Sequence, residues 1–326
     1  MALNFSLLIL AVCLAAVSFS LGSSSISTWQ GLADVINHQE SAASMIFLEV
    51  RAPRTFLALL CGGALGLAGA ALQGLLRNPL ADPSLVGASQ GAAVGAAIAF
   101  YYGGNIFSSA LNIPLAGLLG AVIALFGVLF LAGQSRPILL ILAGLAVSTV
   151  ASAMLSVLLN FAPNPYAMQE LVFWLLGSVA NKDMGHVALL VPAVIIGSIL
   201  VISQRRFLYS LTLGEEVSQT MGFNISRSSR VVILGSAVLV GSCVSVVGNI
   251  GFVGLIVPHI LRPLVKYRPD RLLLPSAILG AALVTAADIF VRLLPPDREL
   301  KLGIVTSLIG APLFIWLIWQ ERRKWV

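Results

Sequence analysis

The sequence predicts an all-α, polytopic membrane protein with about ten transmembrane helices. Three observations predict this fold class. Hydrophobic residues make up 58% of the 326 positions, only 10% of the positions are charged, and the mean hydropathy is +0.99. A soluble domain carries about a quarter charged residues, so this chain has too few charges to cover a water-exposed surface. Its apolar residues also occur in runs of about 20, the length that crosses a bilayer as a helix.

Ten apolar runs define the predicted spans. Inside the hydrocarbon each run must satisfy its own backbone hydrogen bonds, which demands helices, whereas a membrane barrel would show alternating segments of about ten residues. The eighth run is short and flanked by glycines, so we expect a partial or tilted helix there. The runs are 4–22, 55–76, 84–102, 112–133, 137–161, 186–203, 230–248, 251–265, 272–292 and 302–319.

The loops between the runs predict the orientation. Cytoplasmic loops are enriched in Lys and Arg. If the N-terminus lies in the cytoplasm, thirteen of the 19 basic residues fall on the cytoplasmic side and six on the outer side. We therefore expect both termini in the cytoplasm. Residues 1–326 then form a single transmembrane domain, with a cytoplasmic segment at about 205–229. The net charge of +6 has the same origin, and no nucleic-acid partner is expected.

Small residues recur every fourth position in two of the runs. Gly62, Gly66 and Ala70 form one such row, and Gly87, Gly91 and Gly95 begin the next run in the same way. Such rows let helix backbones approach closely in lipid, so tight helix packing is the expected role.

The three cysteines, Cys13, Cys61 and Cys243, each lie inside an apolar run. Their number is odd and none belongs to a CxxC pair, so neither a disulfide framework nor a metal site is expected. The first run lacks a basic segment before it and is interpreted as a span rather than a signal peptide.

The polar segment 211–223 is predicted to form a short helix between two spans. Gly214 suits its start, Glu215 favours the positive end of the helix dipole, and Gly222 suits the position after its last turn. Val217 and Met221, four residues apart, give it a small apolar face. Such a helix either docks in a groove of another protein or lies solvated on the membrane, and the residues alone leave both open.

Seven motifs in order give the chain a family resemblance. It resembles the permeases of ABC transporters that import iron complexes, haem and vitamin B12, over residues of about 50 to 320. The motifs are Arg51-Ala-Pro-Arg54, 73–83 (QGLLRNPLADP), 85–91 (LVGASQG), Leu213-Gly-Glu215 through Gly222, 251–262 (GFVGLIVPHILR), 287–292 (ADIFVR) and 303–314 (GIVTSLIGAPLF).

The resemblance implies a type II ABC importer permease architecture in the bacterial inner membrane. It implies a second permease copy or paralogue, two ATPase subunits, a periplasmic substrate-binding protein and the membrane lipid as partners. No cofactor or metal is expected on this chain, because ATP and Mg would be bound by the ATPase. A ferric siderophore is the expected cargo, since iron chelates are the commonest cargo of similar permeases. Haem, vitamin B12 and oxyanions remain open.

The resemblance also assigns roles to residues at both ends of the spans. Leu213, Gly214, Glu215 and Gly222 match the segment that couples similar permeases to their ATPases. On the outer side, the positions of three arginines match arginines that meet acidic residues of the binding protein, namely Arg51, Arg54 and Arg292. Arginine holds carboxylates with two parallel hydrogen bonds, which suits this role.

Other roles for the three arginines stay open. Arg51 and Arg54 also suit anchoring to lipid headgroups. Arg292 also suits an intramolecular pair with Asp288, one helical turn earlier.

The fifth run is the expected lining of the pathway, because this span lines it in similar permeases. Its hydroxyl residues Ser148 and Ser152, with Thr149 and Ser156, either face the pathway or bond to their own helix backbone. The loop at 134–137, with Ser135 and Pro137, lies where the family has its cytoplasmic gate. Pro137 replaces the small hydroxyl residue expected there.

Two other function classes are weighed against the importer. The chain has no phosphate-binding loop and no mid-span acid, since Asp288 lies near the end of its run. A stand-alone ion-coupled carrier is thus disfavoured, because it usually has mid-span acids. An intramembrane hydrolase would need Ser89, whose Gly87-Ala-Ser89-Gln-Gly91 pattern fits a nucleophile elbow but opens a helix rather than a strand–turn–helix. We expect no catalytic residue and therefore no enzyme.

Overall fold

The computed structural model describes residues 2–21, 28–103, 111–133, 137–295 and 300–322, and the described part of the chain is helical without strands. Ten of its helices match the ten predicted runs, so the predicted fold class is confirmed. They are α1 (Ala2–Ser20), α4 (Ala52–Leu76), α5 (Ala88–Tyr102), α6 (Asn112–Ala132), α7 (Pro137–Asn160), α9 (Met184–Ser203), α12 (Ile225–Val247), α13 (Val253–Leu261), α14 (Pro269–Leu293) and α15 (Leu302–Arg322).

Shorter helices connect these ten. Among the described residues they are α2 (Thr28–Ile36), α3 (Ala42–Ile46), α8 (Pro165–Leu175), α10 (Arg205–Leu211) and α11 (Glu215–Thr220), with the π-helical turn η1 (Phe47–Arg51) and the 3-10 turns η2 (Pro83–Val86) and η4 (Pro263–Val265). Side-chain caps fix several helix starts. Asn164 accepts a hydrogen bond from the Ala167 amide at α8, and Asn224 accepts one from the Arg227 amide at α12.

Seven helices of the described chain are long and apolar enough to cross a membrane by themselves. Two of the remaining helices that match predicted runs are short, since α5 has 15 residues and α13 has nine. The prediction of a partial helix at the eighth run is thus confirmed. The 3-10 turn η2 occupies the first part of the third predicted run, which is why α5 is shorter than that run.

The second span begins earlier than predicted. An apolar helical stretch runs from Ala42 to Leu76 without a break, through α3, η1 and α4. Pro53 favours a helix start at its own position, but here the wider π turn of η1 leads directly into it. Arg51 and Arg54 consequently lie on a continuous helix and not in a loop.

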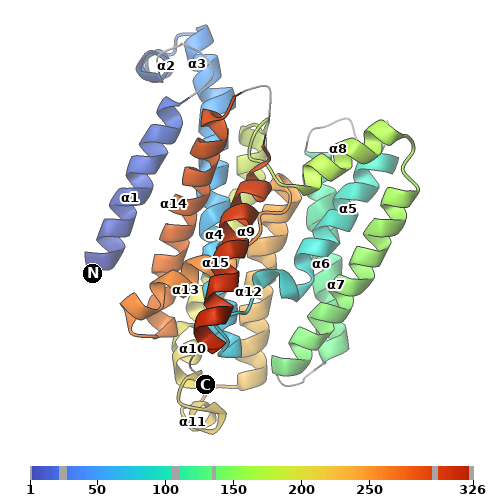
Figure 1. Ribbon diagram of the computed structural model, residues 1–326, viewed down its shortest axis with the longest axis vertical. Coiled ribbons are helices and arrows are strands. Elements are labelled where there is room, and N and C mark those ends of the chain that lie inside the picture. The colour runs from blue at the N-terminus through green and yellow to red at the C-terminus, as the bar shows by residue number, and fades with distance from the viewer. Residues whose placement is uncertain (1, 22–27, 104–110, 134–136, 296–299, 323–326) are drawn as a thin grey trace.

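The connecting helices divide between the two ends of the bundle (Figure 1). Helices α2, α3 and α8 lie at one end, called the α2 end below, and α10 and α11 lie at the other, called the α11 end. Helix α1 stands at the rim beside α14, while α5, α6 and α7 form the opposite side. Both α1 and α15 have their terminal residues toward the α11 end, as an even number of spans requires.

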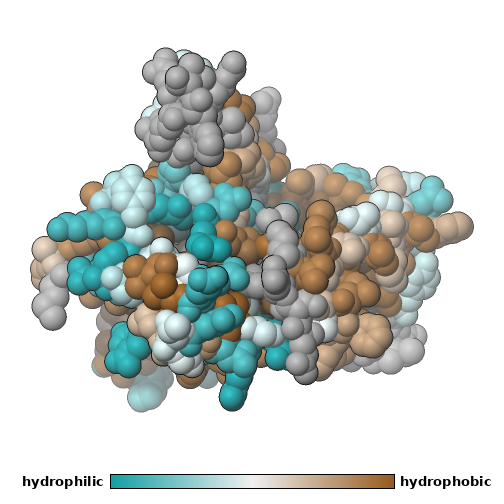
Figure 2. All heavy atoms as spheres, turned by 90° about the horizontal axis from the view of Figure 1, so that it is seen from below, coloured by the Kyte–Doolittle hydropathy of each residue, from teal (hydrophilic) through white to brown (hydrophobic). Residues whose placement is uncertain are grey.

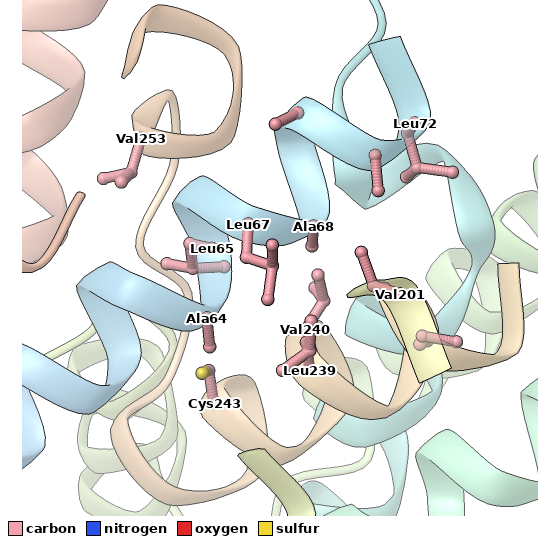
Figure 3. Close-up of a cluster of buried hydrophobic side chains, with 14 of the residues drawn as sticks. Ala64, Leu65, Leu67, Ala68, Leu72, Val201, Leu239, Val240, Cys243 and Val253 are labelled. Carbon is pink, nitrogen blue, oxygen red and sulfur yellow. The ribbon is translucent and has the colours of Figure 1, made fainter. Parts of the chain in front are cut away.

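Glycines let α4 pack against its neighbours backbone to backbone. A Cβ atom added at Gly62 would lie 2.2 Å from the Gly280 carbonyl oxygen of α14, and one at Gly69 would lie 1.8 Å from the Gly254 carbonyl oxygen of α13. The other face of α4 packs on α12, where Cys243 faces Ala64 (Figure 3). The predicted packing role of the glycine row is confirmed.

Candidate functional sites at the two ends of the bundle

Asp288 lies at the centre of a buried ionic cluster at the α2 end. Its side chain is 1% exposed. Arg54 of α4 donates from Nε to both carboxylate oxygens, at 3.0 and 3.1 Å, and from Nη2 to Oδ1 at 2.8 Å. Arg292, one turn further along α14, donates from Nε to Oδ2 at 2.8 Å. One carboxylate therefore pairs with two guanidinium groups and ties α4 to α14.

The remaining donors of the cluster hold the end of α1. Arg292 donates to the carbonyl oxygens of Ser18 and Leu21, at 2.7 and 3.2 Å, and to the Ser18 hydroxyl at 3.1 Å. Arg51 donates to the Phe19 carbonyl at 3.5 Å and to the Thr28 hydroxyl. The last carbonyls of a helix have no partner within the helix, and cations stabilise that end. The arginines thus cap α1 from outside its own sequence.

The cluster bears on each role considered for the three arginines. The Arg292–Asp288 pair is confirmed. Arg51 is 4% exposed, and the side chains of Arg292 and Arg54 are 8% and 21% exposed. Burial of Arg51 excludes headgroup anchoring by that residue in this conformation. Docking of a binding protein stays a prediction, and Arg54 is the most exposed of the three.

The sequence did not single out Ser18 or Thr28 as members of this cluster. Ser18 interrupts the last turn of an apolar run, and its hydroxyl also lies 2.8 Å from that of Thr55. A hydroxyl residue near the end of an apolar run is the sequence signal that would have pointed to Ser18.

At the α11 end, the short helix predicted in the segment 211–223 is confirmed. Helix α10 ends at Leu211, and α11 covers only Glu215–Thr220. Gly214 has φ 109° and Gly222 has φ 87°, values that L-residues with side chains rarely adopt. Gly214 precedes the first residue of α11 and Gly222 follows its last turn, so the predicted limits of the helix are confirmed.

Helix α11 is attached firmly although it is short. The hydroxyls of Ser210 and Ser218 are both buried and lie 2.7 Å apart. The rings of Phe207 and Phe223 lie 5.9 Å apart. Glu215 pairs with Arg77 at the end of α4 at 3.3 Å, in an exposed ion pair. This segment is thus held to α10 and to the end of α4.

Apolar side chains remain exposed on this attached segment. Leu213, Val217 and Met221 all face solvent. Figure 2 looks onto the α11 end, where hydrophilic side chains gather over the half beneath α10, α11 and the start of α14, and hydrophobic ones cover the half beneath α6 and α7. An apolar patch in hydrophilic surroundings indicates a contact surface.

Arg268 joins α10 to the start of α14. Its guanidinium lies 4.4 Å from the centre of the Tyr209 ring and 2.8 Å from the Asp270 carboxylate. The hydrogen bond to Asp270 raises the pKa of Arg268 above its ordinary value.

Gln73 forms a second polar link near the α11 end. Arg262 donates to its Oε1 at 2.7 Å, and its Nε2 donates to the Leu255 carbonyl at 3.1 Å. The link ties α4 to α13. Both residues stand in motifs of the resemblance, but sequence alone did not pair them, since 189 positions separate them.

The hydroxyl residues predicted for the pathway have mixed environments on α7. Thr149 and Ser156 donate to the carbonyls of Leu145 and Ser152, both at 2.9 Å, so the alternative of backbone bonding is confirmed for these two. Ser148 Oγ is buried without a hydrogen-bond partner in the described structure, and Ser152 is half-buried. Pro137 begins α7, and Ser135 lies outside the described residues. Pathway lining stays a prediction.

Ser89 lines a cavity of about 220 Å³ between η2, α12 and the segment before α13. The polar side chains around it include those of Asp82 and Asn249, and the lining residues that the structure describes include no histidine. Asp82 accepts a hydrogen bond from the Ser84 amide at 2.7 Å. The cavity gives Ser89 no imidazole base of the kind that a serine nucleophile needs.

The described part of the chain has the helices of a polytopic membrane protein, with an exposed apolar patch at one end of the bundle and a buried ionic cluster at the other. The chain belongs to the FecCD transport family, which it matches over residues 7–320. As a member of this family it is a transport subunit of ABC importers and not itself an enzyme.

Relatives of this chain include permeases of two import systems. The cobalamin import system permease protein BtuC of Halobacterium salinarum is 38% identical, and the match covers 85% of this chain and 74% of BtuC. The ferric enterobactin transport system permease protein FepD of Escherichia coli is 36% identical, with 97% of this chain and 95% of FepD covered. The solved inward-facing structure of a putative metal-chelate type ABC transporter has a TM-score of 0.80, with 31% identity and 98% of both chains covered.

Proposed function

We propose that this chain imports a ferric siderophore from the periplasm to the cytoplasm by alternating access, powered by a separate ATPase. The main support for this proposal is the similarity to FepD over nearly the full length of both chains. The relative that imports cobalamin makes vitamin B12 the second candidate cargo. In this proposal the protein lies in the bacterial inner membrane with both termini in the cytoplasm, so the α11 end is cytoplasmic and the α2 end is periplasmic.

Reconstituted uptake tests the proposal. Vesicles that contain this chain, its ATPase and ATP are expected to accumulate a radiolabelled ferric siderophore when the binding protein is supplied outside. Vesicles that contain the chain alone, with an ion gradient across the membrane, are expected to accumulate none. Accumulation by the chain alone would replace the importer with a secondary carrier.

The coupling site in this proposal is the exposed patch of Leu213, Val217 and Met221. The hydrogen bond between Ser210 and Ser218 and the contact of Phe207 with Phe223 hold this patch rigidly. A push on α11 therefore reaches α10 through these contacts and reaches α4 through the Glu215–Arg77 pair. Such a segment transmits the closure of two ATPase subunits to the spans of a permease pair.

Leu213→Ala is expected to weaken ATPase binding about tenfold or more. Full burial of a leucine side chain stabilises a contact by about 1.5–3 kcal/mol, and 1.4 kcal/mol corresponds to a factor of ten in affinity. Co-purification of the ATPase with the permease at several concentrations measures the loss. Gln219→Ala, at an exposed position of the adjacent helix α11, is the matched control and should bind normally. Equal binding by both variants would contradict the coupling site.

The docking site for the binding protein in this proposal is the cluster of Arg51, Arg54 and Arg292. Arg54 and Arg292 share the single carboxylate of Asp288, and Arg51 lies beside them at the end of α1, so the cluster has an excess of positive charge at the α2 end. Complementary charge mainly raises the rate of association. Arg54, partly exposed and bonded to Asp288, is the residue that a partner carboxylate reaches first.

Arg54→Gln is expected to slow association with the binding protein, and the difference from the parent should shrink as salt is raised. Surface plasmon resonance on the permease in nanodiscs measures both rates. Lys182→Gln removes a positive charge elsewhere at the α2 end and serves as the control. Thermal unfolding of Arg54→Gln is measured in parallel, because this variant also loses its bond to Asp288. An unchanged association rate at low salt would remove Arg54 from the docking site.

A further inference from the structure

Helix α2 turns its apolar face away from the protein. Gly31 packs against α3, since a Cβ atom added there would lie 2.6 Å from the Ala43 carbonyl oxygen. Asp34, the charged residue of α2, accepts a hydrogen bond from Ser41 at 2.5 Å on the same inner side. Trp29 and Ile36, on the opposite side, are 78% and 68% exposed. An amphipathic helix that packs on its own protein normally has the reverse arrangement.

The start of α2 lies at the depth where α1 ends. The Thr28 hydroxyl donates to the Phe19 carbonyl of the last turn of α1 at 3.1 Å, and Arg51 donates to both groups. Helix α1 has 19 residues, which at 1.5 Å per residue is just long enough to cross the hydrocarbon of about 30 Å. Trp29 follows Thr28 directly, so it lies at the boundary between hydrocarbon and headgroups, the depth that tryptophan prefers.

The apolar face of α2 also continues a surface that faces lipid. Of the seven candidate spans, α1 is the least buried, with 11% of its positions inside the bundle, and Val12 and Val17 on it are exposed. Figure 1 places α2 beside α3, on the side of the bundle where α1 stands. The face turned away from α3 is therefore directed sideways, out of the bundle, and not onto its end where a partner would approach.

We propose that α2 is an interfacial helix that inserts Trp29, Ala33 and Ile36 into the headgroup and acyl boundary of the leaflet at the α2 end. Membrane phospholipid is the partner of this surface. Short helices with one apolar face lie in this way in the plane of the interface. Through Thr28 and Arg51 the inserted helix would also fix the end of α1 at the membrane surface, beside the Asp288 cluster.

Spin labelling of the full permease in liposomes tests the proposal. The labelled position is Ala33→Cys, which keeps both Trp29 and Ile36, in a chain whose three native cysteines are alanine. The expected result is ready collision of the nitroxide with dissolved oxygen and protection from a water-soluble nickel complex. A label at Gln39→Cys, exposed after the end of α2, should show the opposite pattern. Adding Trp29→Ser and Ile36→Ser to the Ala33→Cys chain should make its label accessible to nickel.

Two outcomes overturn the proposal. The label at position 33 would react with nickel as readily as the label at position 39 if α2 stands clear of the lipid. Protection that appears only after a purified periplasmic binding protein is added would assign the face to a protein partner. Both measurements begin with the permease alone in liposomes, so their results do not depend on which cargo it carries.

Discussion

Asp288→Asn is expected to destabilise the folded permease by about 3–5 kcal/mol, the usual cost when one partner of a buried ion pair is removed. The asparagine would leave two guanidinium groups, those of Arg54 and Arg292, without a counter-charge in the cluster that now holds one carboxylate between them. The loss should also loosen the end of α1, because Arg292 reaches the Ser18 and Leu21 carbonyls from this position. The measurement is thermal unfolding of the purified permease in detergent, followed by size-exclusion chromatography.

Asp270→Asn is the matched control, since it removes an aspartate–arginine pair from the other end of the same helix. That pair with Arg268 is partly exposed, and such pairs contribute about 0–1 kcal/mol. The double variant Asp288→Asn with Arg292→Gln should be less destabilised than the sum of the single variants, because it leaves fewer uncompensated charges. Equal losses for Asp288→Asn and Asp270→Asn would contradict the central role of Asp288.

The spans could be predicted from the sequence, since each depends on a local property. A run of about 20 apolar residues has to be helical in lipid whatever its neighbours are. The prediction was weakest where this rule has least force. The short helix α13 and the 3-10 turn η2 lie inside the bundle. Backbone groups there can find hydrogen-bond partners within the protein, which lipid does not offer, so a long helix is not required.

The Asp288 cluster shows what a single sequence leaves out. The pair with Arg292 is four residues apart and was among the predicted alternatives, because helical spacing brings such residues together. The pair with Arg54 joins positions 234 residues apart, and no local rule selects it. The caps that Arg51 and Arg292 provide for α1 are equally remote, so arginines that looked free in the sequence are partly occupied in the fold.

The segment at the α11 end shows the opposite case, in which local chemistry carried most of the information. Gly214 and Gly222 mark the limits of α11 because their backbone angles exclude other residues. Both limits were predicted from the sequence, and α11 lies between these two glycines. A glycine with positive φ ends a helix more often than it continues one, and Gly214 accordingly separates α10 from α11.

Helix α4 connects the two candidate sites. It carries Arg54 in its first turn and ends at Arg77, which pairs with Glu215 of the coupling segment. Along its length it touches α14 through Gly62 and Gly66 and α13 through Gly69. Because these contacts are between backbones, we expect α4 and α14 to move as one unit. In the proposed importer, this unit would carry motion between the binding protein and the ATPase.

Gly62→Ala is expected to destabilise the permease by about 1–3 kcal/mol, the usual cost of overpacking, and to reduce transport further by separating α4 from α14. The added Cβ would lie 2.2 Å from the Gly280 carbonyl oxygen and 2.9 Å from the Ala281 Cα, and neither backbone atom can move without its helix. Thermal unfolding and ATP-driven uptake by the reconstituted complex measure the two effects.

Gly63→Ala, at the adjacent position, is the control for Gly62→Ala. Its effect on the stability of the permease should have the opposite sign. Its Cβ would lie 3.4 Å from the Ala277 carbonyl oxygen and 3.9 Å from the Ala281 Cβ, which are ordinary contacts. Alanine is also favoured over glycine inside a helix by about 0.5–1 kcal/mol, so this variant should be as stable as the parent or more stable. If both variants lost the same stability, general sensitivity of α4 to added side chains would explain the result better than the close approach of α14.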